Sequence, residues 1–341
     1  MAATFNVCVV APTTLLGETL LEILEARAFP IGELHVAGMV DADEETISFR
    51  GEDHTIQDLD KFDFSKCDLA FFCGDRALSE EYAPQAAEVG AVVIDDSDAF
   101  RHDPEVPLVV PEVNGEELAN YEMRHIVANP NSCVIIMALA LKPILDAAGL
   151  SRVNAVSLQA VSGVGRAAVQ ELAQQSIALF NQKPMDIEVF PKQIAFNLLP
   201  LIGGVDEAGI SGEEGKIMGE LKRVLQNHNM GVNVTSIRVP VFYGHSVALH
   251  IETERKLSRE VASRLLESAP GVVLFADDEG VGYPTPLVEA AANDPVFVGR
   301  IREDVSHAHG LDMWAVADNM RKGGALNMIQ IAENLVEKYL G

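Results

Sequence analysis

Basic residues are scarce in this chain of 341 residues, because 25 Lys and Arg stand against 51 Asp and Glu and leave a formal net charge of −26. So large an excess of negative charge repels phosphate backbones and anionic lipid, which argues against nucleic acid and membranes as partners. No apolar run approaches the length of a bilayer-spanning helix, and no basic-then-apolar leader is recognisable at the N-terminus. These absences favour a cytoplasmic protein.

Cysteine is also sparse, and its spacing argues against two kinds of stabilised fold. The cysteines occur without a Cys-x-x-Cys pair or a Cys/His zinc pattern: Cys8, Cys67, Cys73 and Cys133. Neither a disulfide framework nor a metal site is therefore expected, and the thiols are predicted to be reduced. His307 and His309 form a His-x-His without a further ligand at metal spacing, which predicts a solvated loop.

The composition and the residue pattern predict two domains of the α/β class. With 48% hydrophobic residues, the chain is long enough for two large cores. Apolar strand-like runs near residues 5–10, 68–74 and 91–95 alternate with helix-like segments, and this alternation predicts a Rossmann-type parallel sheet. The later part alternates less regularly, as α+β domains do. We predict a Rossmann-type domain at 1–131 and 315–341 and an α+β domain at 132–314.

The most informative stretch is Ala128-Asn129-Pro130-Asn131-Ser132-Cys133, where a short apolar strand ends in a turn and an almost wholly apolar helix begins. A thiol in the first turn of such a helix lies near unpaired backbone N–H groups and the positive end of the helix dipole, which stabilise the nucleophilic thiolate. Cys133 is equally well interpreted as a small core hydrophobe, as most free cysteines are. Position alone leaves both interpretations open.

Asn-Pro-Asn followed by cysteine resembles the nucleophile segment of the aspartate-semialdehyde dehydrogenases, and the resemblance covers nearly the whole chain. It implies an NAD(P)-binding domain and a catalytic and dimerisation domain. It also implies an NADP-linked interconversion of aspartate semialdehyde and aspartyl phosphate, in amino-acid biosynthesis.

This chain departs from that family at the nucleophile, because Ser132 stands at the cysteine position and Cys133 follows one place later. One residue of helix turns a side chain by about 100° and raises it by about 1.5 Å. One alternative is that Ser132 takes the nucleophile's position and forms an ester. The other is a rearranged turn with Cys133 as nucleophile, as in the Asn-x-Ser-Cys sites of glyceraldehyde-phosphate dehydrogenases.

The segment Ser236–Ser246 carries the best-kept chemical signature, because Gly244 lets His245 project from a strand end near Arg238. An imidazole with a pKa near 6.5 can take the thiol proton and return it later, and a guanidinium can hold the substrate carboxylate. Of the nine histidines, His245 is therefore the predicted acid/base.

The resemblance implies further substrate contacts. Arg101 matches a phosphate-binding arginine, and its guanidinium suits the tetrahedral oxyanion of an acyl phosphate. Gln159 matches a substrate-binding glutamine at a strand end. Glu213 and Lys216 match residues that contact the substrate's amino and phosphate groups, although an exposed helix start explains this pair equally well.

The cofactor turn is the segment least like the family. Relatives have Gly-Ala-Thr-Gly-x-x-Gly where this chain has Ala11-Pro12-Thr13-Thr14-Leu15-Leu16-Gly17, and the added Cβ atoms and the proline predict weak or lost binding of NADP or NAD. Residues 41–45 are acidic where NADP-using relatives carry arginine, so they favour NAD or form a solvated loop. The resemblance assigns these residues to the cofactor: Thr13, Thr14, Gly17, Ser162, Gly163, Gly165 and Asn327.

Two functional hypotheses follow from this mixture of kept and altered residues. The first is an aspartate-semialdehyde dehydrogenase of impaired activity with a small-molecule substrate. The second is a catalytically inactive paralogue of the divergent Usg type, acting as a dimeric interaction or regulatory protein. The resemblance implies a homodimer in both cases, and a different substrate on the same scaffold stays open.

Overall fold

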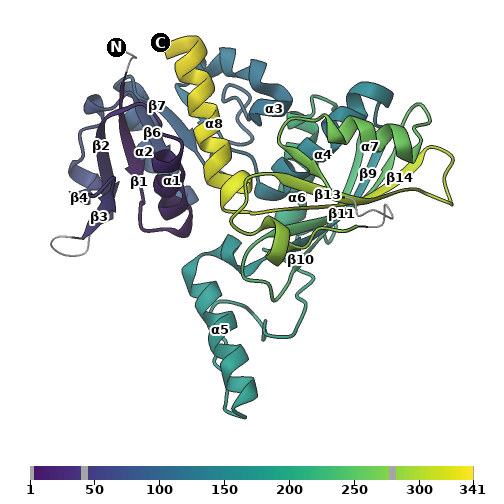
Figure 1. Cartoon of the computed structure of the whole chain (residues 1–341). Helices are drawn as coiled ribbons and strands as arrows, with labels where there is room; N and C mark the ends of the chain where they lie inside the picture. The colour runs from purple at the N-terminus through teal and green to yellow at the C-terminus, as the bar shows by residue number, and fades with distance from the viewer. Residues whose placement is uncertain (1–3, 40–44, 276–281, 341) are drawn as a thin grey trace. The chain divides into compact units, whose positions relative to one another are not determined.

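A computed structural model describes residues 4–39, 45–275 and 282–340 of the chain (Figure 1). Two compact units are present, Met1–Asn131 with Gly324–Gly341 and Ser132–Gly323. The sequence placed the return to the first unit at residue 315, whereas the contacts place it at Gly324. The reason is that strand β14 (Gly310–Ala317) is an inner strand of the second unit's sheet. Within the described ranges no helix is long and apolar enough to span a bilayer.

The first unit contains a parallel sheet, as predicted. Within the described residues it has six strands in the order β5-β2-β1-β6-β7-β8, and every neighbouring pair is parallel. The strands are β1 Phe5–Val10, β2 Ile31–Gly38, β5 Gln57–Asp58, β6 Leu69–Phe72, β7 Val92–Asp95 and β8 Ile126–Ala128. The chain leaves β1 toward β2 and later returns to β6 on the other side, so the order reverses beside β1. In sheets of this kind, ligands bind at the carboxyl ends of the strands flanking that reversal.

Shorter elements and four helices complete the first unit. The hairpin β3–β4 and the helices are β3 Thr46–Phe49, β4 Glu52–Thr55, α1 Leu15–Ala26, α2 Arg76–Glu88, α3 Pro111–Asn114 and α8 Leu326–Leu335. Single helical turns and 3₁₀ segments are η1 Leu59–Lys61, η2 Phe64–Lys66, η3 Gly115–Met123 and η7 Val336–Leu340. The acidic segment 41–45, which bears on the choice between NAD and NADP, lies outside the described residues except for Glu45.

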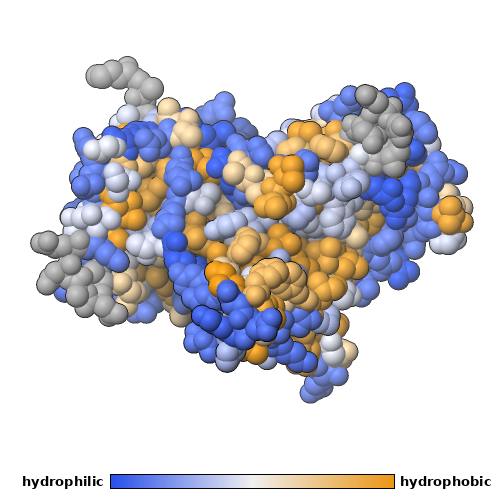
Figure 2. Space-filling view, turned by 60° about the horizontal axis from the view of Figure 1, so that its bottom comes forward, coloured by the Kyte–Doolittle hydropathy of each residue, from blue (hydrophilic) through white to orange (hydrophobic). Residues whose placement is uncertain are grey.

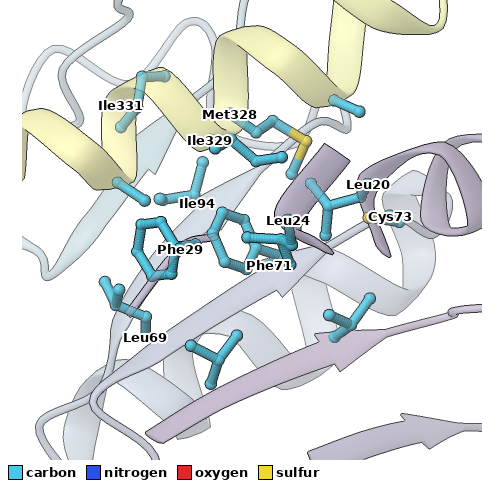
Figure 3. Close-up of a cluster of buried hydrophobic side chains, with 14 of the residues drawn as sticks. Leu20, Leu24, Phe29, Leu69, Phe71, Cys73, Ile94, Met328, Ile329 and Ile331 are labelled. Carbon is cyan, nitrogen blue, oxygen red and sulfur yellow. The ribbon is translucent and has the colours of Figure 1, made fainter. Parts of the chain in front are cut away.

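The core of the first unit explains why the end of the chain returns to it. Helix α8 buries Met328, Ile329 and Ile331 against side chains of α1 and of the central strands, among them Leu24 and Phe71 (Figure 3). These side chains are at most 1% exposed. Full burial of apolar side chains of this size stabilises a fold by roughly 1.5–3 kcal/mol each. The prediction that the last helix packs on the first domain is confirmed.

The second unit contains a mixed sheet, which agrees with the predicted α+β domain. Within the described residues its order is β10-β9-β11-β14-β13-β12, with parallel pairs at both edges and antiparallel pairs in the middle. The strands besides β14 are β9 Arg152–Gln159, β10 Gly231–Arg238, β11 His245–Glu252, β12 Val272–Leu274 and β13 Val296–Glu303.

Helices cover one face of this sheet. Helix α4 contacts β11, β13 and β14, while α6 contacts β10 and α7 contacts β12 and β13. Their bounds and those of the remaining elements are α4 Ser132–Ala148, α5 Arg166–Phe180, α6 Gly212–Val224, α7 Arg259–Glu267, η4 Val161–Val164, η5 Pro286–Ala290 and η6 Arg321–Ala325. Helix α4 is apolar nearly all round because it is buried between this sheet and its neighbouring helices.

Candidate active site

Three of the predicted site residues lie side by side at one end of the second unit's sheet. Gln159 of β9 is the register partner of Arg238 of β10. On the other side of β9, Ser246 of β11 pairs with Leu158, which brings the preceding His245 next to Gln159. Residues that neighbour each other across a sheet point to the same face. Arg238, Gln159 and His245 therefore form one row on the face that carries α4 and α6.

Helix α6 adds Glu213 to this row. The Gln159 amide donates to Glu213 Oε1 at 2.9 Å. Glu213 stands in the first turn of α6 because a capping box starts the helix there: Ser211 Oγ accepts from the Glu214 N–H, and the Ser211 N–H donates to Glu214 Oε2. Lys216 lies three residues further on and is half-buried, so it shares the side of the helix that carries Glu213.

The tautomer of His245 follows from a backbone contact. The Ala160 N–H donates to His245 Nδ1 at 3.1 Å, which leaves the neutral ring's proton on Nε2. Burial, with a smaller contribution from Arg238, lowers the pKa of His245 to about 3. The sequence predicted that His245 takes the thiol proton. In this geometry it instead presents an N–H to the site, and it can accept a proton only if Nδ1 releases the Ala160 N–H.

A turn with no room for a side chain places His245. Gly244 has φ +90, and a Cβ there would lie 2.7 Å from the Pro286 carbonyl oxygen. The Gly244 N–H donates to Asn319 Oδ1 at 2.9 Å, and Asn319 also bonds the Ser162 hydroxyl at 3.0 Å. Asn319 thus ties the turn before His245 to the η4 segment.

Arg238 is also held by a hydrogen bond to the backbone, and it lies beside the small residues of η4. Its Nη1 donates to the Ala160 carbonyl at 2.8 Å. A Cβ on Gly163 would stand 3.3 Å from that nitrogen and from His245 Cε1, so only glycine leaves this approach open. Gly165 ends η4 with φ +107, an easy conformation only for glycine. Ser162, Gly163 and Gly165 therefore border the row of polar groups.

Ser132 and Cys133 open α4 and differ in surroundings. Ser132 is the first residue of the helix and is half-buried, and a Cβ on Gly323 would meet its Cβ at 2.9 Å. Cys133 is fully buried and is hydrogen-bonded to the Ser157 and Ser132 hydroxyls. It is also within electrostatic range of Glu213 and Arg238. The thiol therefore interacts electrostatically with two members of the site, Glu213 and Arg238.

The resting thiol of Cys133 is not activated. Burial, reinforced by the Glu213 carboxylate, raises the pKa of Cys133 well above its usual value, and Arg238 and the two serine hydroxyls offset only part of that. The sequence left two interpretations of this side chain open, a thiolate stabilised by the start of a helix and a small core residue. In the resting structure the loss of solvation is the largest influence on the thiol, which agrees with the second interpretation.

As pH falls, the free energy of unfolding of the unmodified protein is expected to decrease faster than that of a His245→Gln variant. An unfolded histidine takes up a proton near pH 6.5, whereas the pKa of His245 is about 3 in the fold. Between these values the unfolded chain binds the extra proton, so stability decreases as pH decreases. The difference should reach roughly 3 kcal/mol between pH 6.5 and pH 4. Urea unfolding of both proteins across this range measures it, and parallel pH profiles would contradict the assignment.

In the turn after β1 of the first unit, an alanine adopts a backbone conformation that is usual only for glycine. Ala11 has φ 58, a conformation that costs an L-residue roughly 1–2 kcal/mol. A Cβ on Gly17 would meet the Ala11 carbonyl oxygen at 2.6 Å, so α1 packs closely on the turn. Thr14 caps α1, and its hydroxyl lies 3.0 Å from the Ala11 oxygen and 3.1 Å from the Cys73 oxygen. The neighbouring Thr13 is exposed. The Thr14 side chain bridges the carboxyl ends of β1 and β6, where the strand order reverses.

Arg101 and Asn327 belong to the first unit and are both buried. Arg101 donates to the Asp96 backbone carbonyl. The Asn327 amide donates to the Val109 carbonyl at 2.9 Å and to Asn129 Oδ1 at 2.7 Å. Both Asn327 amide hydrogens are thus bonded within the protein. A nicotinamide contact through them, as the resemblance implies, requires one of these bonds to break.

Sequence reasoning missed three residues of the second unit's site: Ser157, Ser236 and Asn319. Ser157 precedes Gln159 by two residues on one strand, so it points to the same face, and this spacing was a usable signal. Ser236 bears the same relation to Arg238. No local pattern in the sequence signals Asn319, because its two contacts lie 75 and 157 residues away.

Two family models match the two units. One described as "Semialdehyde dehydrogenase, NAD binding domain" matches residues 6–121, and one described as "Semialdehyde dehydrogenase, dimerisation domain" matches residues 141–322. Together with the two sheets, these matches place the chain in the class of two-domain semialdehyde dehydrogenases.

Full-length relatives narrow this class. The chain is 47% identical to an aspartate-semialdehyde dehydrogenase of Shewanella violacea over 99% of this chain and all of that protein. It is 44% identical to one of Legionella pneumophila over the whole chain and 98% of that protein. The structure of aspartate semialdehyde dehydrogenase II from Vibrio cholerae, complexed with ASA, superposes with a TM-score of 0.97 at 43% identity, covering 99% of this chain and 100% of that one. The chain belongs to the aspartate-semialdehyde dehydrogenase family.

Proposed function

We propose that this protein interconverts aspartate semialdehyde and aspartyl phosphate with NADP or NAD, at a lower rate than relatives that carry cysteine at the preceding position. The observation that carries the proposal is the convergence of Cys133, Gln159, Glu213, Arg238 and His245 at one end of one sheet. A thiol, a neutral imidazole, a buried guanidinium and a carboxylate are the groups that this chemistry requires.

Each residue takes the role that its geometry allows. The Cys133 sulfur adds to the aldehyde carbon, and the thiol proton ends on the substrate oxygen, so the addition changes no net charge. The His245 Nε2–H donates to that oxygen as charge develops there. Arg238 holds the substrate carboxylate and Glu213 its ammonium group. Oxidation would take a hydride from the former aldehyde carbon to the bound nicotinamide and release the hydroxyl proton to solvent, and phosphate would then displace the sulfur from the thioester as thiolate. The resemblance implies that the Arg101 guanidinium binds phosphate.

The turn after β1 in the first unit fits a dinucleotide, although its side chains leave less room for the pyrophosphate than a glycine-rich turn does. The Ala11 backbone conformation and the close packing of Gly17 keep the turn, and the start of α1 offers backbone N–H groups to a pyrophosphate. Thr13, Thr14 and Gly17 would hold the cofactor there. When bound, the nicotinamide ring supplies the hydride acceptor. We propose weakened affinity because the Thr14 side chain occupies the place that a second glycine leaves open.

Thr14→Gly is expected to tighten nucleotide binding by about tenfold. The change frees the backbone at the strand-order reversal and, as an N-cap replacement, costs the helix only a few tenths of a kcal/mol. Calorimetric titration with NADP and NAD measures the change. Thr19→Ala, which removes a hydroxyl bonded to Leu15 within the same helix, is the matched control. Unchanged or weaker binding in Thr14→Gly would contradict the proposed obstruction.

We propose a homodimer formed through the second unit. That unit matches the family model named for dimerisation. Figure 2 shows hydrophobic residues gathered on the surface that faces the viewer. The large apolar side chains exposed on α5 and the segment after it include Ile177, Phe180, Ile187, Phe196, Leu198 and Leu201. The four cysteines of the whole chain are free, buried thiols, which fits the reducing cytoplasm that we propose as the protein's compartment.

A second candidate function is that of an inactive Usg-type paralogue acting as a dimeric regulatory or interaction protein. The observation that favours it is the full burial of the Cys133 thiol and the raised pKa that results. The impaired dehydrogenase and the inactive paralogue differ in one measurable step, the oxidation of the aldehyde.

The deciding experiment combines nucleotide calorimetry with a phosphate-dependent assay of aspartate semialdehyde oxidation. Nucleotide binding together with slow, phosphate-dependent reduction of NADP or NAD supports the dehydrogenase. Failure of a folded protein to bind either nucleotide removes dehydrogenase chemistry and supports the inactive paralogue.

A further inference from the structure

Two buried serine hydroxyls lie beneath Cys133 and have no part in the reaction described above. Ser157 of β9 and Ser236 of β10 are register partners, and their Oγ atoms are 3.0 Å apart. Both residues are 0% exposed, as is Cys133. Buried hydroxyls lower stability unless each finds a partner. The identity of their partners therefore indicates what the pair does.

The partners connect the pair to the site. Ser157 Oγ accepts from the Gln159 amide at 3.3 Å and is hydrogen-bonded to the Cys133 thiol. The Ser236 backbone N–H donates to Glu214 Oε1 at 3.0 Å, which fixes β10 against the start of α6. A continuous series of hydrogen-bonding groups therefore runs from the sulfur through Ser157 to Ser236.

We propose that Ser157 and Ser236 are positioning residues that hold the Cys133 sulfur and stabilise its thiolate. The inference rests on the proposed function only in taking Cys133 as the nucleophile. It gives a reason for the displaced cysteine: one place later in α4, the side chain turns by about 100°, toward hydroxyls of the sheet.

The pair suits both protonation states of the sulfur because a hydroxyl donates one hydrogen bond and accepts others. With the thiol, S–H can donate to Ser157, and Ser157 then donates to Ser236. With the thiolate, both bonds reverse, so that Ser236 donates to Ser157 and Ser157 donates to the sulfur. Reversal needs only hydroxyl rotation. In a fully buried site, such a donor replaces the solvation that burial removes from the anion.

The test is the rate at which iodoacetamide alkylates each cysteine of the full chain near pH 8, resolved by peptide mass spectrometry. Only the thiolate reacts, so below the pKa the rate follows the small thiolate fraction. We expect Ser157→Ala to slow alkylation of Cys133 by roughly 10- to 100-fold, the effect of one hydrogen bond to a charged group. Ser157→Thr, which keeps the hydroxyl, should retain the rate, and Ser236→Ala should give a smaller slowing.

Whether Ser157→Ala slows or speeds the alkylation of Cys133 separates a role in stabilising the thiolate from a purely structural role. Loosened packing in Ser157→Ala would admit the reagent and speed the reaction, whereas loss of thiolate stabilisation slows it. Ser246→Ala is the matched control, because it removes a buried hydroxyl from the opposite face of β11 at the same level. Cys8, Cys67 and Cys73 report global opening within the same sample.

Slowing confined to Cys133, with rescue by threonine, supports the proposal. An unchanged or faster rate at Cys133, a parallel change at all four cysteines, or failure of threonine to rescue would overturn it. The readout uses neither cofactor nor substrate. A protein that proved inactive in the dehydrogenase assay could thus still show the slowing, which would refute the proposed function and leave this inference standing.

Discussion

Cys133→Ala is expected to lower the rate of aspartate semialdehyde oxidation by about 10⁴-fold or more, because it removes the atom that forms the covalent intermediate. Ser132→Ala removes one hydrogen bond to the thiol and is expected to cost no more than about tenfold. Steady-state kinetics with saturating phosphate measure both. The two substituted residues are neighbours in the first turn of α4. General damage to this helix would therefore lower the activity of both variants alike.

The double exchange Ser132→Cys with Cys133→Ser sharpens this prediction, because it produces the order of residues that the resemblance to the family implies. We expect it to be inactive or much weaker than the parent, since Ser157, Glu213 and Arg238 act on position 133. An exchanged protein as active as the parent or more active would show that the site is built for a nucleophile at position 132.

Gly244→Ala is expected to destabilise the second unit by roughly 3 kcal/mol or more and to abolish activity. A side chain at φ +90 is strained by about 1–2 kcal/mol, and its Cβ would stand 2.7 Å from the Pro286 carbonyl oxygen, so backbone must move. The moved segment would carry His245 out of the row that it shares with Gln159 and Arg238. Denaturant unfolding and the oxidation assay measure the two effects.

Gly209→Ala is the matched control for this variant. Gly209 has φ +81 in the same unit, and nothing lies within 4 Å of the position its Cβ would take. It should therefore show the backbone strain alone. Equal losses of stability in the two variants would mean that the contact with Pro286 is unimportant.

Much of the architecture could be predicted from local pattern. Alternating apolar strands and amphipathic helices indicated the parallel sheet, because period-2 and period-3.6 burial are properties of short segments. The apolar face of α8 indicated that this helix is buried, and the resemblance to the family placed it on the first unit. The boundary near residue 315 was not, because Gly310–Ala317 reads as a buried strand without indicating which sheet it joins.

The candidate site was predictable by residue type but not by arrangement. Gln159, Arg238 and His245 were found one by one through resemblance, whereas their common row depends on the register of β9 with β10 and β11, which no local pattern specifies. The sequence left the state of Cys133 open for a similar reason. The helix dipole is visible in the sequence, but the burial that raises the thiol's pKa comes from distant segments.

Two charged groups act on the Cys133 thiol in opposite directions: the Glu213 carboxylate raises its pKa and the Arg238 guanidinium lowers it. Binding of the substrate's ammonium group by Glu213 would weaken the first effect. The thiol is accordingly expected to become more reactive when substrate occupies the site than in the resting protein.

The most direct test of the account is to trap the covalent intermediate. The protein is incubated with aspartate semialdehyde and oxidised NADP or NAD in the absence of phosphate, quenched in acid, digested, and examined by mass spectrometry. The account predicts an aspartyl thioester on Cys133, absent in Cys133→Ala and lost when phosphate is added. An adduct on Ser132, or none on a protein that binds nucleotide, would contradict it.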